Sequence, residues 1–146
     1  LKKSIVSVAQ LEKSDLFNKK TNSLSKSIIN SPFGIIAEHK RRSPSKATIN
    51  NSFAVEDVAK GYENAGASGI SVLTDMKYFG GSLEDLLLAR ASVRIPLLRK
   101  EFIVDEYQLL EAKAFGADAI LLIAAVLTKE EIKQLATPEI CASGTA

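Results

Sequence analysis

Short apolar runs alternate with longer amphipathic stretches along most of this chain. The apolar runs predict four strands, over residues 34–39, 69–73, 97–100 and 119–124. The amphipathic stretches that follow them predict helices over residues 55–66, 82–92, 105–115 and 128–137. Four strand–helix units in succession predict a parallel sheet with crossover helices. Such a pattern fits a small open sheet or the first half of a (βα)8 barrel, and it does not choose between them.

The remaining segments carry weaker signals. Residues 1–30 are polar with scattered apolar positions, and they predict one or two short helices with a break or cap at Ser14-Asp15. The segments 43–54 and 74–81 are predicted to be loops. Ser82 and Thr128 are candidate N-caps, because each is followed closely by acidic residues.

Charge patterning places candidate chemistry at the ends of two strands. Side chains alternate along a strand, so Glu38 and Lys40 share one face while His39 lies on the other. The strand over 97–100 also ends in a cation, Lys100. In parallel α/β folds, ligands bind at the carboxyl ends of the strands. We therefore expect Glu38, Lys40 and Lys100 to lie near one another, with His39 in a structural position facing the helices.

Composition narrows the class of protein. The 146 residues are 46% hydrophobic and 25% charged, which is ordinary for one globular domain. A net charge of +2 gives little reason to expect a nucleic-acid partner, but it leaves room for an anionic substrate. The single cysteine, Cys141, excludes an internal disulfide framework. No apolar run reaches membrane-spanning length, so we expect a cytoplasmic protein without a membrane partner.

Four motifs together resemble indole-3-glycerol phosphate synthase of tryptophan biosynthesis: AEHKRRSPSK, SVLTDMKYFGGSLEDL, PLLRKEFIVDEYQ and GADAILLIAAVLT. The resemblance spans residues 11–135. It implies an α/β fold, a TIM (βα)8 barrel, of which this chain holds a helical extension (1–30), the first four βα units (31–136) and an atypical tail (137–146). The chain departs from the family in that tail, TPEICASGTA, and at Glu101, where the family usually has aspartate.

The resemblance also implies roles for particular side chains. Lys100 would be the acid that protonates a carbonyl oxygen, Lys40 would hold anionic substrate groups, and Glu38 would orient polar groups and hold the lysines. The other implied residues border the substrate: Ser43, Ser45, Phe79 and Phe102. No cofactor or metal is implied, and the partner is a small phosphorylated substrate. The base and most of the phosphate site belong to strands five to eight, so the chain alone is expected to be inactive.

Three alternatives remain open from the residues. The run KRRSPSK over residues 40–46 has the charge of a nucleic-acid patch, but no aromatic residues are interleaved for base stacking. Another phosphosugar barrel enzyme, such as phosphoribosylanthranilate isomerase, would share the fold. A non-catalytic half-barrel could instead associate with a second copy of itself through its open sheet edges.

Overall fold

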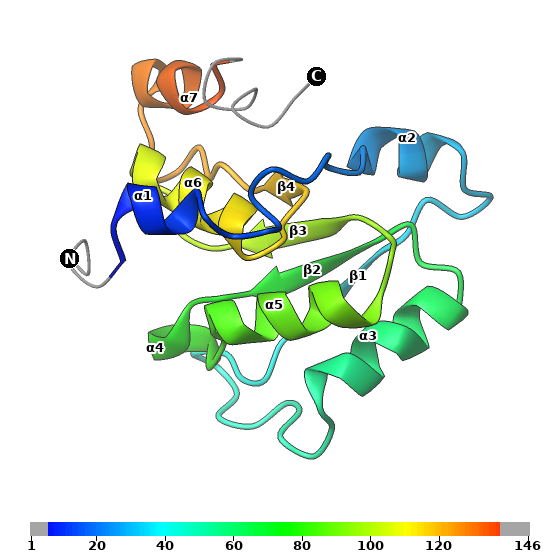
Figure 1. Ribbon diagram of the computed structural model, residues 1–146. Helices are drawn as coiled ribbons and strands as arrows, with labels where there is room; N and C mark the ends of the chain where they lie inside the picture. The colour runs from blue at the N-terminus through cyan, green and yellow to red at the C-terminus, as the bar shows by residue number, and fades with distance from the viewer. Residues whose placement is uncertain (1–5, 138–146) are drawn as a thin grey trace.

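A computed structural model of the protein describes residues 6–137. At its centre lies one sheet of four parallel strands in the order β1-β2-β3-β4, so each strand pairs with its neighbour in the sequence (Figure 1). The strands are β1 (Ile36–His39), β2 (Gly69–Leu73), β3 (Leu97–Lys100) and β4 (Ala119–Ile120). The predicted parallel sheet is confirmed, and β2 and β3 have the predicted bounds.

Helices precede, connect and follow the strands. Within the described residues they are α1 (Val8–Leu11), α2 (Leu24–Ile29), α3 (Val55–Asn64), α4 (Met76–Phe79), α5 (Leu83–Ser92), α6 (Glu106–Ala114) and α7 (Lys129–Leu135). Helix α3 packs against α5, and the short N-terminal α1 packs against α6 (Figure 1). The sequence predicts one or two short helices in residues 1–30, and the described part of this segment contains two, α1 and α2, with Ser14-Asp15 between them.

Local side-chain caps explain where several of these helices begin. The Oγ of Ser82 accepts a hydrogen bond from the backbone N–H of Asp85 at the start of α5. Asp105 and Gln108 form a reciprocal capping box at α6. Thr128 and its partner three residues later, Glu131, form another at α7. Each cap satisfies backbone donors that the first helical turn would otherwise leave unpaired, so the two predicted caps are confirmed.

The hydrophobic core lies between the sheet and its helices. Ile70 and Val72, two residues apart on β2, point to the same side and are fully buried. They pack with Leu97 of β3 and with Leu86 of α5 in one cluster. Burying each such side chain contributes about 1.5–3 kcal/mol, which makes this contact layer the main source of stability for the strand–helix units.

One predicted loop contains a helix. Residues 74–81 include α4, which the polar and glycine-rich sequence did not suggest. The Oδ1 of Asp75 accepts hydrogen bonds from the backbone of Tyr78 at 2.6 Å and Phe79 at 3.3 Å. Gly80 then ends the helix with φ 68°, a left-handed conformation that glycine adopts without steric cost. A single cap and stop therefore suffice for one helical turn.

The fourth strand is shorter than predicted. The pattern predicts a strand over 119–124, whereas β4 is only Ala119–Ile120. It pairs with β3 at Leu98 and Arg99, and no described strand lies along its other edge. Apolar character alone does not make a strand without a hydrogen-bonding partner. The prediction is wrong from residue 121 onward.

The ends of the chain fall partly outside the description. Strand β1 begins at Ile36, later than predicted, because Gly34 turns the backbone with φ 59°. Pro138, the tail after it and Cys141 lie outside the described residues. Among residues 6–137, no helix combines the length and apolar character required to cross a bilayer.

Candidate functional site

Three charged side chains meet at the carboxyl ends of β1 and β3. The Nζ of Lys100 lies 2.6 Å from Glu38 Oε2, and the Nζ of Lys40 lies 3.1 Å from Glu38 Oε1. The side chains of Lys100, Glu38 and Lys40 are 38%, 28% and 33% exposed. We refer to these three residues as the β1–β3 ion cluster. One carboxylate joins two lysines that lie far apart in the sequence, and all three remain accessible to a ligand.

The sheet register explains this meeting. Glu38 of β1 lies opposite Ser71 of β2, and Leu73, two residues further along β2, lies opposite Lys100 of β3. Lys100 therefore projects from the same face as Glu38, one pleat further toward the carboxyl end of the sheet. Its long side chain reaches back across β2 to the carboxylate. This is the proximity that the alternation along the strands predicts.

The cluster sets the charge of its carboxylate. Burial alone would raise the pKa of Glu38, but hydrogen bonds from Lys100 and Lys40, together with their charges, lower that pKa below its ordinary value of 4.5. Glu38 is therefore an ionised acceptor at neutral pH. It can hold two ammonium groups in place, but it has no proton of its own to give.

His39 lies on the other face of β1 and is buried. Neither of its ring nitrogens has a hydrogen-bond partner among the described residues. Burial lowers the pKa of His39, the nearby Arg41 lowers it further, and Asp85 of α5 opposes the shift. The ring is thus held neutral on the side of the helices, away from the β1–β3 ion cluster, and we assign it no part in the chemistry.

A small apolar pocket of about 80 Å³ adjoins the cluster. Its lining comes from β2, the α4 region, the end of β3 and the segment after β4: Leu73, Asp75, Phe79, Lys100, Glu101, Phe102 and Ile123. The structure therefore brings Phe79 and Phe102 together with Lys100. Its volume is below the roughly 300 Å³ typical of a complete ligand pocket, so these residues alone do not enclose a substrate-sized site.

The two candidate serines lie elsewhere. Ser43 and Ser45 have their hydroxyl oxygens 3.1 Å apart in a tight turn, which the backbone N–H of Lys46 closes by donating to Ser43 Oγ. They line a separate hollow with Lys77 and Tyr78 of the α4 region. No hydrogen bond within the described part of the chain joins either serine to the β1–β3 ion cluster. The structure does not bring these residues together with Lys100.

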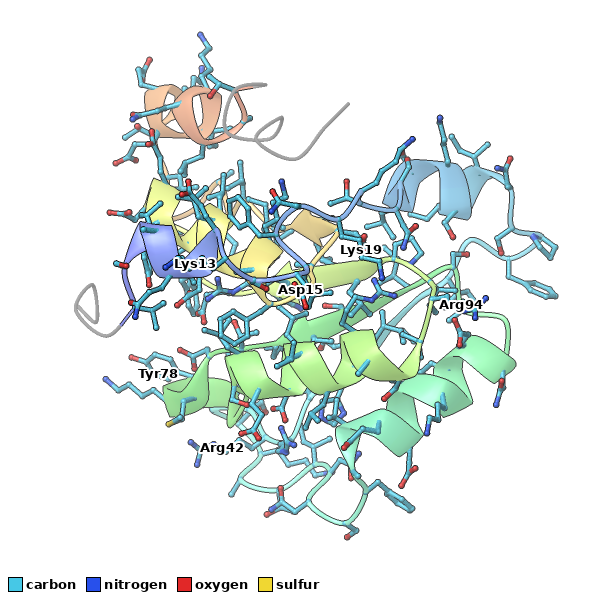
Figure 2. All side chains as sticks on the ribbon, in the orientation of Figure 1. Lys13, Asp15, Lys19, Arg42, Tyr78 and Arg94 are labelled. Atoms are coloured by element: carbon cyan, nitrogen blue, oxygen red, sulfur yellow. The ribbon has the colours of Figure 1, made fainter. Side chains whose placement is uncertain are left out.

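The basic run around these serines is largely engaged inside the chain. Arg41 forms a bidentate ion pair with Asp85 of α5. Arg42 donates from Nη2 to the carbonyl oxygens of Met76 at 2.6 Å and Lys77 at 3.0 Å, and so ties the loop to α4. Figure 2 shows Arg42 and Tyr78 at this same end of the molecule. These long-range pairings were not predicted, because the sequence pattern carries no signal for them.

A buried arginine behind Lys100 also escaped prediction. Arg99 points to the helix side of β3, where its Nη2 lies 2.9 Å from Glu111 Oε2 and its Nη1 donates to Gln108 O at 2.8 Å. Its Nε donates to Thr74 Oγ1, which in turn donates to Glu101 Oε2 at 3.0 Å. The ends of β2 and β3 are thereby fixed to α6 beneath the site. The sequence contains only one indication of this position: side chains alternate along a strand, so Arg99 projects from the opposite face of the sheet to Lys100.

The polar groups of the site can bind anions and donate protons. Within residues 6–137 no group of three or more histidine, cysteine, aspartate or glutamate side chains is arranged to hold a metal ion. The ammonium groups of Lys40 and Lys100 have further donors beyond those used by Glu38. The arrangement can therefore bind an anionic, partly aromatic molecule and donate a proton to it.

Comparison with known proteins identifies the family. The family model described as indole-3-glycerol phosphate synthase matches residues 1–139, nearly the whole chain. The chain belongs to the indole-3-glycerol phosphate synthase family. This family has the (βα)8-barrel fold, and the four parallel strands with alternating helices are consistent with part of such a barrel.

Several curated relatives carry the family name. The synthase of Bacteroides thetaiotaomicron is 48% identical over 136 residues, which cover 93% of this chain and 52% of the relative. The synthase of Leptospira interrogans is 55% identical over 111 residues, covering 76% of this chain and 44% of the relative. The synthase of Aquifex aeolicus is 57% identical over 101 residues, which cover 69% of this chain and 39% of the relative. The chain thus spans about half the length of the relatives it matches, in agreement with an N-terminal portion.

Proposed function

We propose that the complete protein containing this chain is an indole-3-glycerol phosphate synthase acting in tryptophan biosynthesis. It would close the ring of an anthranilate-bearing, phosphorylated open-chain sugar, with loss of carbon dioxide and water. The observation that carries this proposal is the 2.6 Å contact between Lys100 and Glu38 beside the pocket of Phe79 and Phe102, in a chain of this family.

The three members of the β1–β3 ion cluster take different roles in this proposal. Lys100 is the acid that protonates the carbonyl oxygen under attack, since Glu38 orients its ammonium group while other N–H donors stay available. Glu38 holds both lysines at one carboxylate. Lys40 binds anionic groups of the substrate, because its side chain is partly exposed at the strand end.

The remaining candidate residues would shape the substrate site. Phe79 and Phe102 provide the apolar wall against which an aromatic ring can pack. Ser43 and Ser45, in the loop after β1, would border the entrance to the substrate site. Their loop lies beside α4, and neither serine forms a hydrogen bond with the β1–β3 ion cluster among the described residues. We propose that the reaction uses no cofactor or metal. The substrate is a small phosphorylated molecule, and we place the protein in the cytoplasm.

The same contacts weigh against nucleic-acid binding through the run KRRSPSK. Lys40 pairs with Glu38, Arg41 pairs with Asp85, and Arg42 is used by two carbonyl oxygens. Only one further basic residue of the run remains. A surface for phosphate contacts needs several uncommitted cations, so we assign this run to the architecture of the site.

The proposal is tested by replacing the acid. In the complete protein, Lys100→Ala should lower the rate of indole formation by about a hundredfold or more, with substrate binding largely kept, because a positioned acid contributes on this scale. Lys60→Ala, at an exposed lysine of α3, is the matched control and should leave turnover unchanged. Near-normal turnover in Lys100→Ala would remove Lys100 from the mechanism.

The chain of 146 residues is proposed to be the helical extension (1–30) and first four units (31–136) of the barrel, inactive by itself. Ile36 on edge strand β1 is 39% exposed, and β4 is only partly buried, so both sheet edges remain available for pairing. The isolated chain should therefore self-associate or bind a complementary half. Indole formation and mass in solution test this, and a fully active monomer would contradict both statements.

A further inference from the structure

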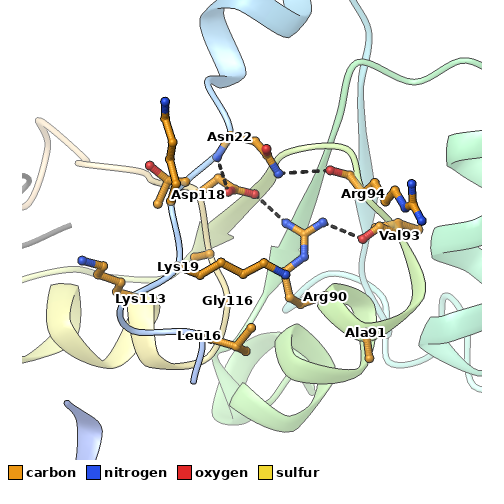
Figure 3. Close-up of a pocket in the computed structure, with 13 residues that line it drawn as sticks. Leu16, Lys19, Asn22, Arg90, Ala91, Val93, Arg94, Lys113, Gly116 and Asp118 are labelled. Atoms are coloured by element: carbon orange, nitrogen blue, oxygen red, sulfur yellow. Dashed lines mark hydrogen bonds and ion pairs between the residues drawn. The ribbon is translucent and has the colours of Figure 1, made fainter. Parts of the chain in front are cut away.

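A second, larger hollow lies at the opposite end of the sheet from Lys100. Its volume is about 500 Å³, within the range of small-molecule sites. It is enclosed by the segment between α1 and α2 and by the C-terminal ends of α5 and α6 (Figure 3). Figure 2 shows Lys19 and Arg94 at this end, far from Arg42 and Tyr78. We refer to this space as the basic hollow.

In one wall of the basic hollow, an arginine and an aspartate form a buried ion pair. The Nη1 of Arg90 lies 2.7 Å from Asp118 Oδ2, and these side chains are only 11% and 5% exposed. Asp118 also accepts from the backbone N–H groups of Leu97 at 2.9 Å and Asn22 at 2.7 Å. The second guanidinium nitrogen of Arg90 donates to the carbonyl of Val93 (Figure 3). Asp118 therefore has no charge left to neutralise further cations.

The other lining charges are all positive. Besides Arg90 and Asp118, the charged residues around the hollow are Lys19, Lys20, Arg94 and Lys113. Five basic side chains and one carboxylate leave a formal charge of +4 in this one hollow, whereas the whole sequence has a net charge of +2. A concave surface lined by charges of one sign concentrates counter-ions.

Helix ends account for part of this charge. Cations near the C-terminus of a helix interact favourably with the helix dipole, and Arg90 and Lys113 occupy the last turns of α5 and α6. The Nζ of Lys113 also lies 4.8 Å from the centre of the Phe17 ring. Lys19, Lys20 and Arg94 are different, because they lie outside the helices.

Nothing in the described protein balances those three cations. No ion pair joins Lys19, Lys20 or Arg94 to any described residue. Glu63 of α3 lies close to Arg94, but its carboxylate accepts from the backbone N–H groups of Arg94 and Ile95 and does not line the hollow. Three exposed basic side chains therefore line the hollow without an ion-pair partner among the described residues.

We propose that the basic hollow binds a small molecule carrying two or more phosphate charges. Lysine and arginine together suit phosphate oxygens, the first as point charges and the second as a planar fork of donors. The volume accommodates a diphosphate-sized group with part of the molecule that carries it. This site lies at the opposite end of the strands from the β1–β3 ion cluster, and it does not depend on the proposed reaction.

The test uses inorganic pyrophosphate as the probe and the complete protein, by titration calorimetry at low salt. The double variant Lys19→Gln/Arg94→Gln should weaken binding at least about tenfold, because it removes two positive charges that attract the phosphate groups. Lys13→Gln is the matched control, because Lys13 is an exposed lysine of the same N-terminal segment that does not line the hollow. Its affinity should equal that of the unaltered protein.

A second comparison separates the hollow from the proposed substrate site, which also attracts phosphate. In Lys40→Gln, the binding event that is weakened in the double variant should persist with unchanged affinity. Circular dichroism checks that every variant is folded. Equal affinity in the double variant and the unaltered protein would overturn the proposal, as would binding lost only in Lys40→Gln. Failure of pyrophosphate to bind the unaltered protein would also overturn it, whether or not an acidic peptide binds instead.

Discussion

The two ends of the sheet use ion pairs in different ways. At the carboxyl ends of the strands, Glu38 shares its carboxylate between two lysines, and all three side chains remain partly exposed. At the opposite end, the pair of Arg90 and Asp118 is nearly inaccessible, and Asp118 also receives two backbone N–H groups. The first arrangement leaves donors available to a ligand, whereas the second uses its acceptor within the fold.

This difference predicts which of the two ion pairs contributes more to stability. An ion pair in contact with water contributes little to stability, because solvent competes for both charges. A buried pair with completed hydrogen bonds is costly to break, because removing one partner leaves the other without compensation. Substitutions at the two ends should therefore separate the two properties.

The largest effect is expected at Asp118. Asp118→Ala removes the acceptor for Arg90 and for two backbone N–H groups, so the free energy of unfolding should fall by about 3 kcal/mol. Urea denaturation measures this change. Asp15→Ala is the control, because Asp15 is an exposed aspartate in the same part of the molecule, and it should change stability by less than about 0.5 kcal/mol (Figure 2). Similar losses in both variants would contradict the comparison.

Two adjacent residues of β3 sharpen the comparison within one strand. Arg99→Met removes hydrogen bonds to Thr74 and Gln108 and the pair with Glu111, so the free energy of unfolding should fall by about 2 kcal/mol. Lys100→Met, on the opposite face, should cost less than about 1 kcal/mol because its partner is partly exposed. Urea denaturation of the two variants would refute this distinction if Lys100→Met proved the less stable.

The pH dependence of the β1–β3 ion cluster gives a smaller effect. Hydrogen bonds and charges from the lysines outweigh burial and lower the pKa of Glu38 in the folded protein. The cluster therefore stabilises the fold above pH 4.5, and this contribution is lost as pH falls through the folded-state pKa. Glu38→Gln should lose less than about 1 kcal/mol at pH 7, and the difference from the unaltered protein should shrink at pH 3.5. Denaturation at both pH values measures it, and a difference that grows in acid would contradict the assignment.

Much of the fold could be predicted because it depends on local patterns. Short apolar runs determined β2 and β3, and the caps Ser82 and Thr128 marked two helix starts. The same alternation placed Glu38 on the face of Lys100, since neighbouring parallel strands share their faces. The strands and caps need only residues close together in the sequence, whereas the meeting of Glu38 and Lys100 also needs the register of the sheet.

What could not be predicted depends on contacts between distant segments. Arg41 could not be matched with Asp85, nor Arg90 with Asp118, because any of several carboxylates in the sequence was an equal candidate. Strand β4 was predicted too long for a related reason: its length depends on hydrogen bonds to a neighbour, which the apolar pattern does not report. The helix α4 required only one cap and one glycine, a signal too short to distinguish from a turn.

The smallest predicted effect concerns His39, the buried last residue of β1, which follows Glu38 on the opposite face of the strand. Burial and the charge of Arg41 lower its pKa against the opposing effect of Asp85, so the folded protein binds the proton less readily than the unfolded chain. Its contribution is fully present above the unfolded value of about 6.5, and stability should fall as pH decreases below it.

His39→Leu should remove this pH dependence. The substitution also replaces a ring whose two nitrogens have no hydrogen-bond partner among the described residues, so stability at pH 7.5 should stay within about 1 kcal/mol of the unaltered protein. The measurement is the free energy of unfolding at pH 7.5 and pH 5.5. For each protein, the change in the free energy of unfolding between the two pH values gives a slope. Because His39 is the only histidine of this sequence, the difference between the slopes of the variant and the unaltered protein isolates its titration. Equal slopes would show that the ring takes up a proton as easily in the folded state as in the unfolded one, and would place it in contact with water or an acceptor.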